Sequence, residues 1–375
     1  MGCTRVNTIE FKNIQTQFAN KEILIGLRQN DKLYELNAFI QCLSHIDQLI
    51  NYIKYKYNKI KERNSYMKYK QTGKCLLDSF KNMLDKLWPK EAIKEKKTFI
   101  KSENSKELLE MIYKINPLYD ENQELLINFF LMRLHNELNK CEGEIKANEE
   151  IIIDETNKDL TVKLFTENFG KNNMSLISDL FFGTYYSNFV CNICGHNGFN
   201  FQSYIYGFYS LSQVFQYKYM TCQNNQNTLY MNKMINLKEI NIYDCLYFDQ
   251  QIKSNFQICN SCHKRVPHNF QNNIYIAPEI YSFVFNKNDL MPNINFLIEK
   301  NINIILFSEV KINTKYELIG VIYYFSPNRY ISYCYNVIDN KWYCYDDENV
   351  KIKDSFQEVI SGNYIPYMLF YKNIK

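Results

Sequence analysis

The segments Cys191-Asn192-Ile193-Cys194 and Cys259-Asn260-Ser261-Cys262 form the most informative pattern in this sequence of 375 residues. Two residues between paired cysteines allow a tight turn to present both thiolates to one metal ion, and two such turns complete a tetrahedron. The 64 residues between the pairs must therefore return the second turn to the first. Four cysteine ligands leave no position for a catalytic water, so we expect a structural zinc ion.

Two alternatives accompany this prediction. A histidine close behind either pair, His196 or His263, could replace one cysteine, although each is better interpreted as a neighbour of the site. The second alternative is that the thiols are simply buried and bind no metal.

The sequence changes in character near residue 175. Before it, apolar residues recur at helical spacing from residue 35 to residue 53, and again at about 75–93, 104–115 and 121–140. After it, short runs rich in Tyr, Phe, Ile and Val alternate with polar turns, which is typical of strands. These runs cover residues 199–212, 273–285, 303–310, 316–325, 329–338 and 364–371. Helices followed by a sheet-rich part predict an α+β fold.

Composition permits a large core, because 46% of the residues are hydrophobic and only 11 are Gly and 7 Pro. The net charge of +4 is small for this length. Residues 54–74 are basic and rich in Tyr, a combination that nucleic-acid surfaces use. A solvated helical face is the better interpretation, because a weak overall charge does little to concentrate polyanions.

Several features favour a reducing compartment inside the cell. The 12 cysteines are scattered apart from the two pairs, which does not resemble a disulfide framework. No apolar run reaches the roughly 18 residues that span a bilayer, and we find no signal peptide. We therefore expect a cytoplasmic protein, with the nucleus as an alternative. Membrane contact would require acylation of Gly2 or Cys3, and Val6 occupies the place of the small hydroxyl residue in that motif.

The order of several motifs resembles the ubiquitin-specific protease family. Phe181-x-Gly183-x-x-x-Ser187-x-x-x-Cys191 and the later cysteine pair resemble its zinc-binding fingers. The other landmarks, in chain order, are Gly26-Leu27, Asn37-Ala38-Phe39, Gln123-Glu124-Leu125-Leu126, Leu134-His135-Asn136-Glu137-Leu138, the run 278–285, the run 316–321, Tyr330 to Tyr333, the run 342–347 and the run 367–371. Each is degenerate alone, but together they cover residues 22–372 in the family's order.

The resemblance implies a papain-like hand with a helical thumb, a β palm and zinc-ribbon fingers. Residues 1–21 would precede a domain at 22–375. Within it, the thumb would span about 22–170, the fingers about 175–270, and the palm about 200–212 and 271–375. The expected ligands of the zinc ion are Cys191, Cys194, Cys259 and Cys262.

The family's chemistry uses a cysteine at a helix N-terminus, a histidine base, an orienting Asp or Asn, and an Asn amide for the oxyanion. The family pattern Gly-Leu-x-Asn-x-Gly-Asn-Thr-Cys-Tyr-Met-Asn aligns without gaps on residues 26–37, which puts Tyr34 at the nucleophile and Gln29 at the oxyanion Asn. Arg329 replaces the histidine of Gly-His-Tyr, and no histidine follows His268. The acid is retained as Asp346, with Asp347 beside it.

Tyrosine is a poor nucleophile toward an isopeptide, because its phenol has a pKa near 10. Arginine stays protonated and cannot act as a base. Cys42 lies eight residues further along the same helix, about 12 Å away. Cys334 and Cys344 lie on the palm strands with no histidine near them in the sequence.

We therefore predict a catalytically inactive relative that binds ubiquitin or a ubiquitin-like protein, or that serves as a structural subunit of a larger complex. An active hydrolase with displaced catalytic residues is the first alternative. A zinc-ribbon protein that binds nucleic acid is the less favoured second.

Overall fold

The computed structural model describes residues 25–28, 34–88, 99–100, 103–117, 119, 125–141, 157–223, 239–289, 294–337, 339–362 and 364–374. The predicted extension 1–21, with Gly2 and Cys3, and the predicted oxyanion residue Gln29 lie outside these ranges. The chain forms two compact units. The first contains Met1–Glu142, Ser175–Ile177 and Ile319–Gly362, and the second contains Gly143–Met174, Ser178–Leu318 and Asn363–Lys375.

The first unit begins with a group of helices. They are α2 (Tyr34–Leu43), α3 (Asp47–Lys61), α4 (Asn64–Gln71), α5 (Leu76–Leu87), α6 (Glu103–Ile115) and α7 (Leu126–Leu138). Their core contains a chain of edge-to-face rings, because Phe130 of α7 lies 5.6 Å from Phe39 and 5.2 Å from Phe80. The helical stripes predicted from residue 35 onward face this core.

The apolar run from residue 35 to residue 53 forms two helices rather than one continuous helix. Side chains at the junction bond to the last turn of α2, since Ser44 Oγ donates to the Gln41 carbonyl at 2.8 Å and His45 Nδ1 lies 2.8 Å from the same oxygen. The backbone also tightens, because the Ile46 N–H bonds to the Leu43 carbonyl three residues earlier at 3.2 Å. Such local bonds compete with helix continuation without breaking the hydrophobic period.

A distant carboxylate caps α5. The Glu137 side chain of α7 is fully buried and accepts the N–H groups of Leu76 at 2.9 Å and Leu77 at 2.7 Å. Arg133 Nε donates to the same carboxylate at 2.7 Å. The helix-preceding residue Cys75 makes no side-chain cap of its own. Glu137 therefore satisfies N–H groups at the start of α5 that would otherwise be unpaired.

We expect Glu137→Ala to destabilise the chain by about 3–5 kcal/mol, because it leaves Arg133 and two buried N–H groups without their acceptor. Urea unfolding with an unchanged slope measures this loss. Glu110→Ala is the matched control, because its i,i+4 pair with Lys106 is more than half exposed and should cost less than about 0.5 kcal/mol. Equal effects of the two substitutions would contradict the capping role.

The first unit ends in an antiparallel sheet. Its strands are β12 (Lys315–Ser326), whose first residues belong to the second unit, then β13 (Arg329–Asn336), β14 (Lys341–Asp346) and β15 (Asn349–Lys353). The short helix α13 (Phe356–Ile360) follows, and the Tyr323 hydroxyl donates to the Val359 carbonyl at 3.1 Å. Two short strands, β1 (Gly26–Leu27) and β2 (Phe99–Ile100), pair in parallel.

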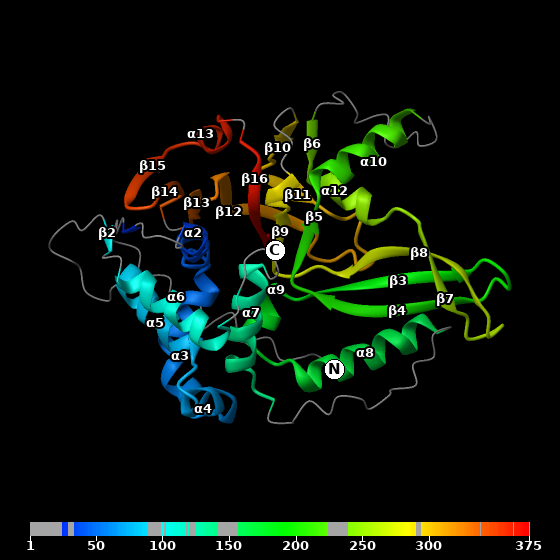
Figure 1. Cartoon of the computed structure of the whole chain (residues 1–375), viewed down its shortest axis with the longest axis horizontal. Coiled ribbons are helices and arrows are strands. Elements are labelled where there is room, and N and C mark those ends of the chain that lie inside the picture. The colour runs from blue at the N-terminus through cyan, green and yellow to red at the C-terminus, as the bar shows by residue number, and fades with distance from the viewer. Residues whose placement is uncertain are drawn as a thin grey trace. The chain divides into compact units, whose positions relative to one another are not determined.

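The second unit contains a four-stranded antiparallel sheet in the order β4-β3-β8-β7. Its strands are β3 (Gly183–Cys191), β4 (Asn197–Tyr204), β7 (Lys253–Ile258) and β8 (Arg265–Ile276). The helix α8 (Lys158–Asn172) packs along β4 (Figure 1), where Phe165 lies 6.1 Å from Phe201. The helix α9 (Leu176–Phe181) leads into β3.

The rest of the second unit combines strands and helices. The strand β9 (Ile280–Phe285) pairs in parallel with β5 (Tyr206–Tyr209) and antiparallel with β16 (Pro366–Asn373). The strand β6 (Glu239–Asn241) pairs with β10 (Asn295–Leu297), and β11 (Asn301–Asn303) pairs with the start of β12. The helices are α10 (Leu211–Gln223), α12 (Ile242–Asp249) and the 3-10 turn η1 (Lys287–Asp289).

The mixed helix and sheet content confirms the predicted fold class, but two local predictions were wrong. The strand predicted at 303–310 ends at Asn303, because its side chain accepts the Ile305 N–H at 3.1 Å and the chain turns there. The run 273–285 divides into β8 and β9, which flank the segment containing Pro278. A proline cannot donate to a sheet ladder. Within the described residues, no helix is both long and apolar enough to cross a bilayer.

A half-buried acid lies beside tyrosines in the second unit. The Tyr209 hydroxyl donates to Asp249 Oδ2 at 2.6 Å, and Tyr209 packs on Phe283 of β9. Burial raises the pKa of Asp249 from 3.8 to about 6. An acid with a higher pKa in the folded chain binds its proton more tightly there, so stability falls as pH rises from the unfolded to the folded pKa.

We expect Asp249→Asn to be more stable than the natural chain at pH 8, by up to about 3 kcal/mol. The advantage should shrink as the pH is lowered through about 6, the folded pKa of Asp249. Asparagine keeps an acceptor for the Tyr209 hydroxyl, so the change removes mainly the charge. Denaturant unfolding of both proteins between about pH 5 and pH 8 measures the difference. A difference that does not change with pH would contradict the assignment, and Asp159→Asn, on a surface helix residue, is the control.

Candidate functional site

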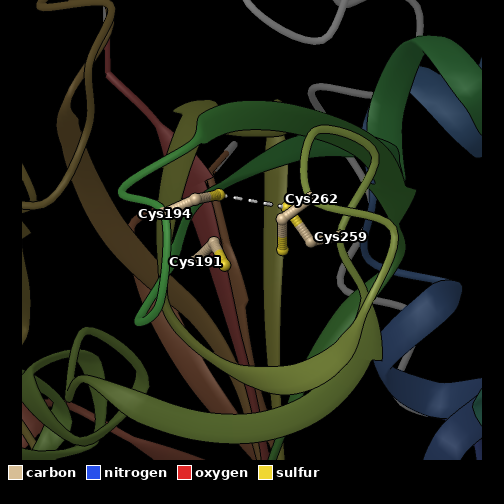
Figure 2. Close-up of side chains that lie close together, drawn as sticks. All are labelled: Cys191, Cys194, Cys259 and Cys262. Atoms are coloured by element: carbon tan, nitrogen blue, oxygen red, sulfur yellow. Dashed lines mark hydrogen bonds between the residues drawn. The ribbon is translucent and has the colours of Figure 1, made fainter.

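The four predicted metal ligands meet at one end of the four-stranded sheet in the second unit. The sulfur atoms of Cys191, Cys194, Cys259 and Cys262 all lie within 4.8 Å of one another. The Cys194 and Cys259 sulfurs are 3.6 Å apart, and Figure 2 shows all four side chains converging. Register explains the meeting, because β3 and β7 flank β8 and end at the two cysteine turns.

The two cysteine turns have the same backbone geometry. The Gly195 N–H donates to the Cys191 carbonyl at 3.0 Å, and the His263 N–H donates to the Cys259 carbonyl at 2.8 Å. Both donors lie in the left-handed region, with φ values of 71° and 57°. Glycine adopts this region without steric cost, whereas His263 adopts it at some cost. His263 thus closes the second cysteine turn through its backbone N–H, and its side chain is not part of the sulfur cluster.

The four thiols fit a tetrahedral metal ion. Zinc–sulfur bonds of about 2.3 Å place tetrahedral sulfurs about 3.8 Å apart, close to the observed 3.6 Å. A hydrogen bond from the Cys262 backbone N–H helps to lower the pKa of Cys259 to about 5, which favours the thiolate that a metal requires. For Cys262, a backbone hydrogen bond at Lys264 lowers the pKa, but desolvation and the adjacent Cys259 thiol raise it overall to about 11. Among the described residues, neither His196 nor His263 belongs to the cluster. The structure thus brings the predicted ligands together and can hold a metal there.

The first unit assembles the positions of the predicted catalytic groups. Arg329 begins β13 and its guanidinium donates to Asp346 Oδ2, at the end of β14, at 3.0 Å. The guanidinium also lies 5.2 Å from the centre of the Phe325 ring. These residues border an open pocket of about 270 Å³, lined by Asn328, Arg329, Asp346, Asp347, Glu348 and Asn349. The expected base position therefore carries a paired cation.

The turn after Asp346 joins this pocket to the first landmark of the sequence. The Leu27 N–H donates to the Asp347 carbonyl at 3.0 Å. A Cβ atom on Gly26 would lie only 2.6 Å from the Asp347 and Glu348 carbonyl oxygens, so a side chain does not fit there. Asp347 has a φ of 53°, and burial, with the neighbouring charge of Asp346, raises its pKa to about 6. An Asn37 hydrogen bond opposes that rise.

Tyr34 is the first residue of α2, the helix position that the resemblance assigns to the nucleophile. The residues that follow Tyr34 and Arg329 meet, since the Tyr330 hydroxyl donates to Glu35 Oε2 at 3.3 Å. The helix α2 packs against β13 and β14. The fold thus brings the start of α2 toward the strand that begins with Arg329.

The other cysteines of the first unit that the sequence singled out are buried. Cys42 of α2 and Cys334 of β13 lie 3.7 Å apart, and burial raises the pKa of Cys334 well above its usual value. Burial also raises the pKa of Cys344. Thiols of this kind are inert, because the thiolate is the nucleophilic form.

The two histidines of the first unit, His45 and His135, are buried and form hydrogen bonds in its core. Burial lowers the pKa of His45 to about 4, and its ring contacts the Gln41 carbonyl and the Tyr345 hydroxyl. His135 is buried and lies 2.7 Å from Ser175 Oγ.

The basic segment 54–74 contains an internal network. The hydroxyls of Tyr57 and Tyr66 donate to Asp78 Oδ1 at 2.6 and 2.9 Å, and Lys70 pairs with the same carboxylate. Lys54 is buried and donates to the Trp88 carbonyl. Several of the aromatic and basic groups that suggested nucleic acid therefore stabilise the helices.

Sequence reasoning missed the contacts that link these landmarks, including Glu35 with Tyr330 and Arg28 with Glu348 at 3.5 Å. Each joins residues about 300 positions apart, and no spacing along the chain indicates such a pair. Glu35 is the one charged residue of α2, and this was the available signal.

Comparison with known proteins gives consistent results. A family model described as ubiquitin carboxyl-terminal hydrolase matches residues 35–371. A Drosophila melanogaster protein described as ubiquitin carboxyl-terminal hydrolase Usp2 is 27% identical over 188 residues, which are 49% of this chain and 18% of that protein. The chain thus matches about a fifth of the length of this curated relative.

Two solved structures share the fold. One is the SAGA DUB module of Ubp8, Sgf11, Sus1 and Sgf73 bound to monoubiquitin, with a TM-score of 0.59 and 16% identity over 96% of this chain and 70% of that one. The other is the yeast SAGA DUBm with a mutant Sgf73, with a TM-score of 0.59 and 16% identity over 95% of this chain and 70% of that one.

Proposed function

The chain belongs to the ubiquitin carboxyl-terminal hydrolase family, and we propose that it is a catalytically inactive member that works by binding. Its partner would be ubiquitin, a ubiquitin-like protein, or the subunits of a larger complex. The observation that carries this proposal is the ion pair between Arg329 and Asp346.

This pair supports inactivity because a base is absent from its expected place. A histidine there would accept the proton of a thiol, whereas a guanidinium stays charged and only donates hydrogen bonds. The Arg329 guanidinium also forms an ion pair with Asp346, the carboxylate that would orient a histidine base. Asp346, to which the resemblance assigns the role of the acid, thus pairs with a cation instead.

The nucleophile position supports the same proposal. A helix N-terminus lowers the pKa of a thiol, and Tyr34 offers a phenol there. The other cysteines that the sequence offered in this unit, Cys42, Cys334 and Cys344, are buried. Within the described residues of the first unit, both histidines are buried and hydrogen-bonded in the core.

The retained parts explain why such a chain would persist. The four-cysteine cluster fits zinc, and Gly26 fits closely against the 347–348 turn, which supports a chain retained for its folded shape. We propose that the ion is zinc and that its role is structural, because four thiols leave no place for a substrate. A similar fold occurs in a structure described as bound to monoubiquitin and to other subunits.

Titration of the full chain with ubiquitin, combined with an electrophilic ubiquitin probe, tests the proposal. We expect reversible binding and no covalent adduct at native metal content. A covalent adduct at any cysteine would show an active hydrolase and overturn the inactivity. Absence of ubiquitin binding would leave the subunit role, which copurification with a defined complex would then have to show.

A further inference from the structure

The edge strand of the four-stranded sheet carries an exposed row of apolar side chains. Phe256 and Ile258 occupy alternate positions of β7 and project from one face, with Ser254 next in the same row. Ile252 precedes the strand at the same spacing. The side chains of Ile252, Phe256 and Ile258 are 71%, 62% and 68% exposed. We name this row the apolar stripe. Contiguous exposed apolar groups of this kind mark interaction surfaces.

The stripe continues the sheet face that α8 covers. Directly paired residues of neighbouring strands share a face. Tyr186 of β3 pairs with Phe201 of β4, and Phe201 packs on Phe165 of α8. Lys158, the first residue of α8, lies 4.2 Å from the centre of the Tyr186 ring.

The register carries this face across to β7. Val190 shares the face of Tyr186 on β3 and pairs with Asn269 of β8, which pairs with Ser254 of β7. Ser254 alternates with Phe256, so both lie on this face. The stripe and the 37% exposed Val190 therefore extend the covered face beyond the start of α8.

One exposed base borders the stripe. Residues 187–204 and 251–277 contain no Asp or Glu. Arg265 is exposed and pairs with Ile258, so it lies beside the stripe on the same face. Lys253 alternates with the stripe residues and lies on the opposite face, over the Phe248 ring. Cys191 alternates with Val190, which puts this metal ligand on the opposite face. The charge near the stripe thus favours an acidic partner.

The edge of β7 argues against the addition of another strand. The Phe256 N–H, which an added strand would need, already donates to the Asn255 side chain at 2.8 Å. A partner would instead contact the side chains. Alternate strand residues lie about 6.6 Å apart, close to the about 6 Å between positions i and i+4 of a helix. A row of helical side chains can therefore match the stripe.

We infer that the apolar stripe is a docking surface for an amphipathic helix of a partner protein, with acidic side chains beside its apolar face. A second copy of this chain does not suit the surface, because in a two-fold contact the same face, which has no acid within residues 187–204 and 251–277, would lie opposite Arg265. The inference concerns a surface separate from the pocket of Arg329 and Asp346.

Fluorescence titration of the full metal-loaded chain tests the inference with two labelled helical peptides. One has leucines on one face and glutamates elsewhere, and the other has lysines in place of the glutamates. We expect the acidic peptide to bind at least about 10-fold more tightly than the basic one at low salt. The preference should weaken when salt is raised from about 50 to about 300 mM.

Matched variants locate the contact. Phe256→Glu and Ile258→Glu should each weaken binding of the acidic peptide at least about 10-fold. Ile312→Glu should leave it unchanged, because Ile312 is 71% exposed but lies outside the sheet. Unchanged metal content shows that each variant is folded.

Three outcomes of these peptide and variant measurements would overturn the inference. They are equal binding of the two peptides, no effect of the stripe variants, and a dimer that these variants dissociate. A loss of ubiquitin binding in the stripe variants would also overturn it, because the surface would then belong to ubiquitin. Retained ubiquitin binding with lost peptide binding separates this inference from the proposed function.

Discussion

Removal of the metal from this chain is expected to unfold the end of the four-stranded sheet. The turns at Cys191–Cys194 and Cys259–Cys262 contain few apolar groups, and the sulfur cluster is what joins them. Structural zinc contributes about 10–16 kcal/mol in small zinc domains, as much as the whole stability of many proteins. We therefore expect Cys191→Ser or Cys259→Ser to cost more than about 4 kcal/mol.

Metal analysis and thermal unfolding measure this effect together. The natural chain should contain one zinc per molecule, and both ligand variants should lose metal and melt at a much lower temperature. Cys222→Ser is the control, because Cys222 is a half-buried cysteine of the same unit outside the cluster. His263→Gly should also keep the metal, since glycine suits the φ of 57°. An unchanged melting temperature in the ligand variants would show that no structural metal is bound.

The second large effect concerns catalysis. Loss of a nucleophile or a base in a protease triad costs about 10⁶-fold in kcat, so the natural chain should show no measurable cleavage of ubiquitin conjugates. We expect Tyr34→Cys combined with Arg329→His to recover at most weak turnover. A misplacement of about 1 Å near the reacting groups can cost about 10²-fold. Gln29, which the resemblance puts at the position of the oxyanion Asn, is longer than asparagine by one methylene.

Turnover of a fluorogenic ubiquitin substrate and labelling by the electrophilic probe measure this recovery separately. The double variant should be labelled, because the introduced thiol would lie at a helix start that favours the thiolate, while its turnover stays low. Tyr34→Phe with Arg329→His keeps the ring and is the control for changes in the pocket. Turnover at the level of active family members would refute the expectation of weak recovery, because Gln29 would then not impair catalysis.

The success of sequence reasoning differed between local and distant features. The cysteine pairs were found because a metal turn is encoded by two residues at fixed spacing, and their meeting follows once β3, β8 and β7 pair. The long helices of the first unit were predicted correctly because their apolar residues recur at helical spacing in the sequence. The strand predicted at 303–310 failed because the side chain of one residue, Asn303, bonds to the backbone and turns the chain.

The catalytic positions were assigned only through the resemblance, because a cysteine, a histidine or their replacements have no periodic signal. The resemblance assigned Tyr34 and Arg329 to these positions. It did not indicate that the Arg329 guanidinium pairs with Asp346, or that Glu35 and Tyr330 connect the two elements.

The sequence by itself determined the order of the landmarks, the helix-then-sheet character and which four thiols would cluster. These features depend on residue type and on spacing within a few positions. Only the tertiary structure decided that Glu137 caps α5, that Gly26 fits against the 347–348 turn, and that Arg329 engages the remaining acid. Those contacts join residues 17 to more than 300 positions apart, and packing of whole elements brings them together. Local chain preferences do not specify such contacts, because their energy appears only when the core has formed.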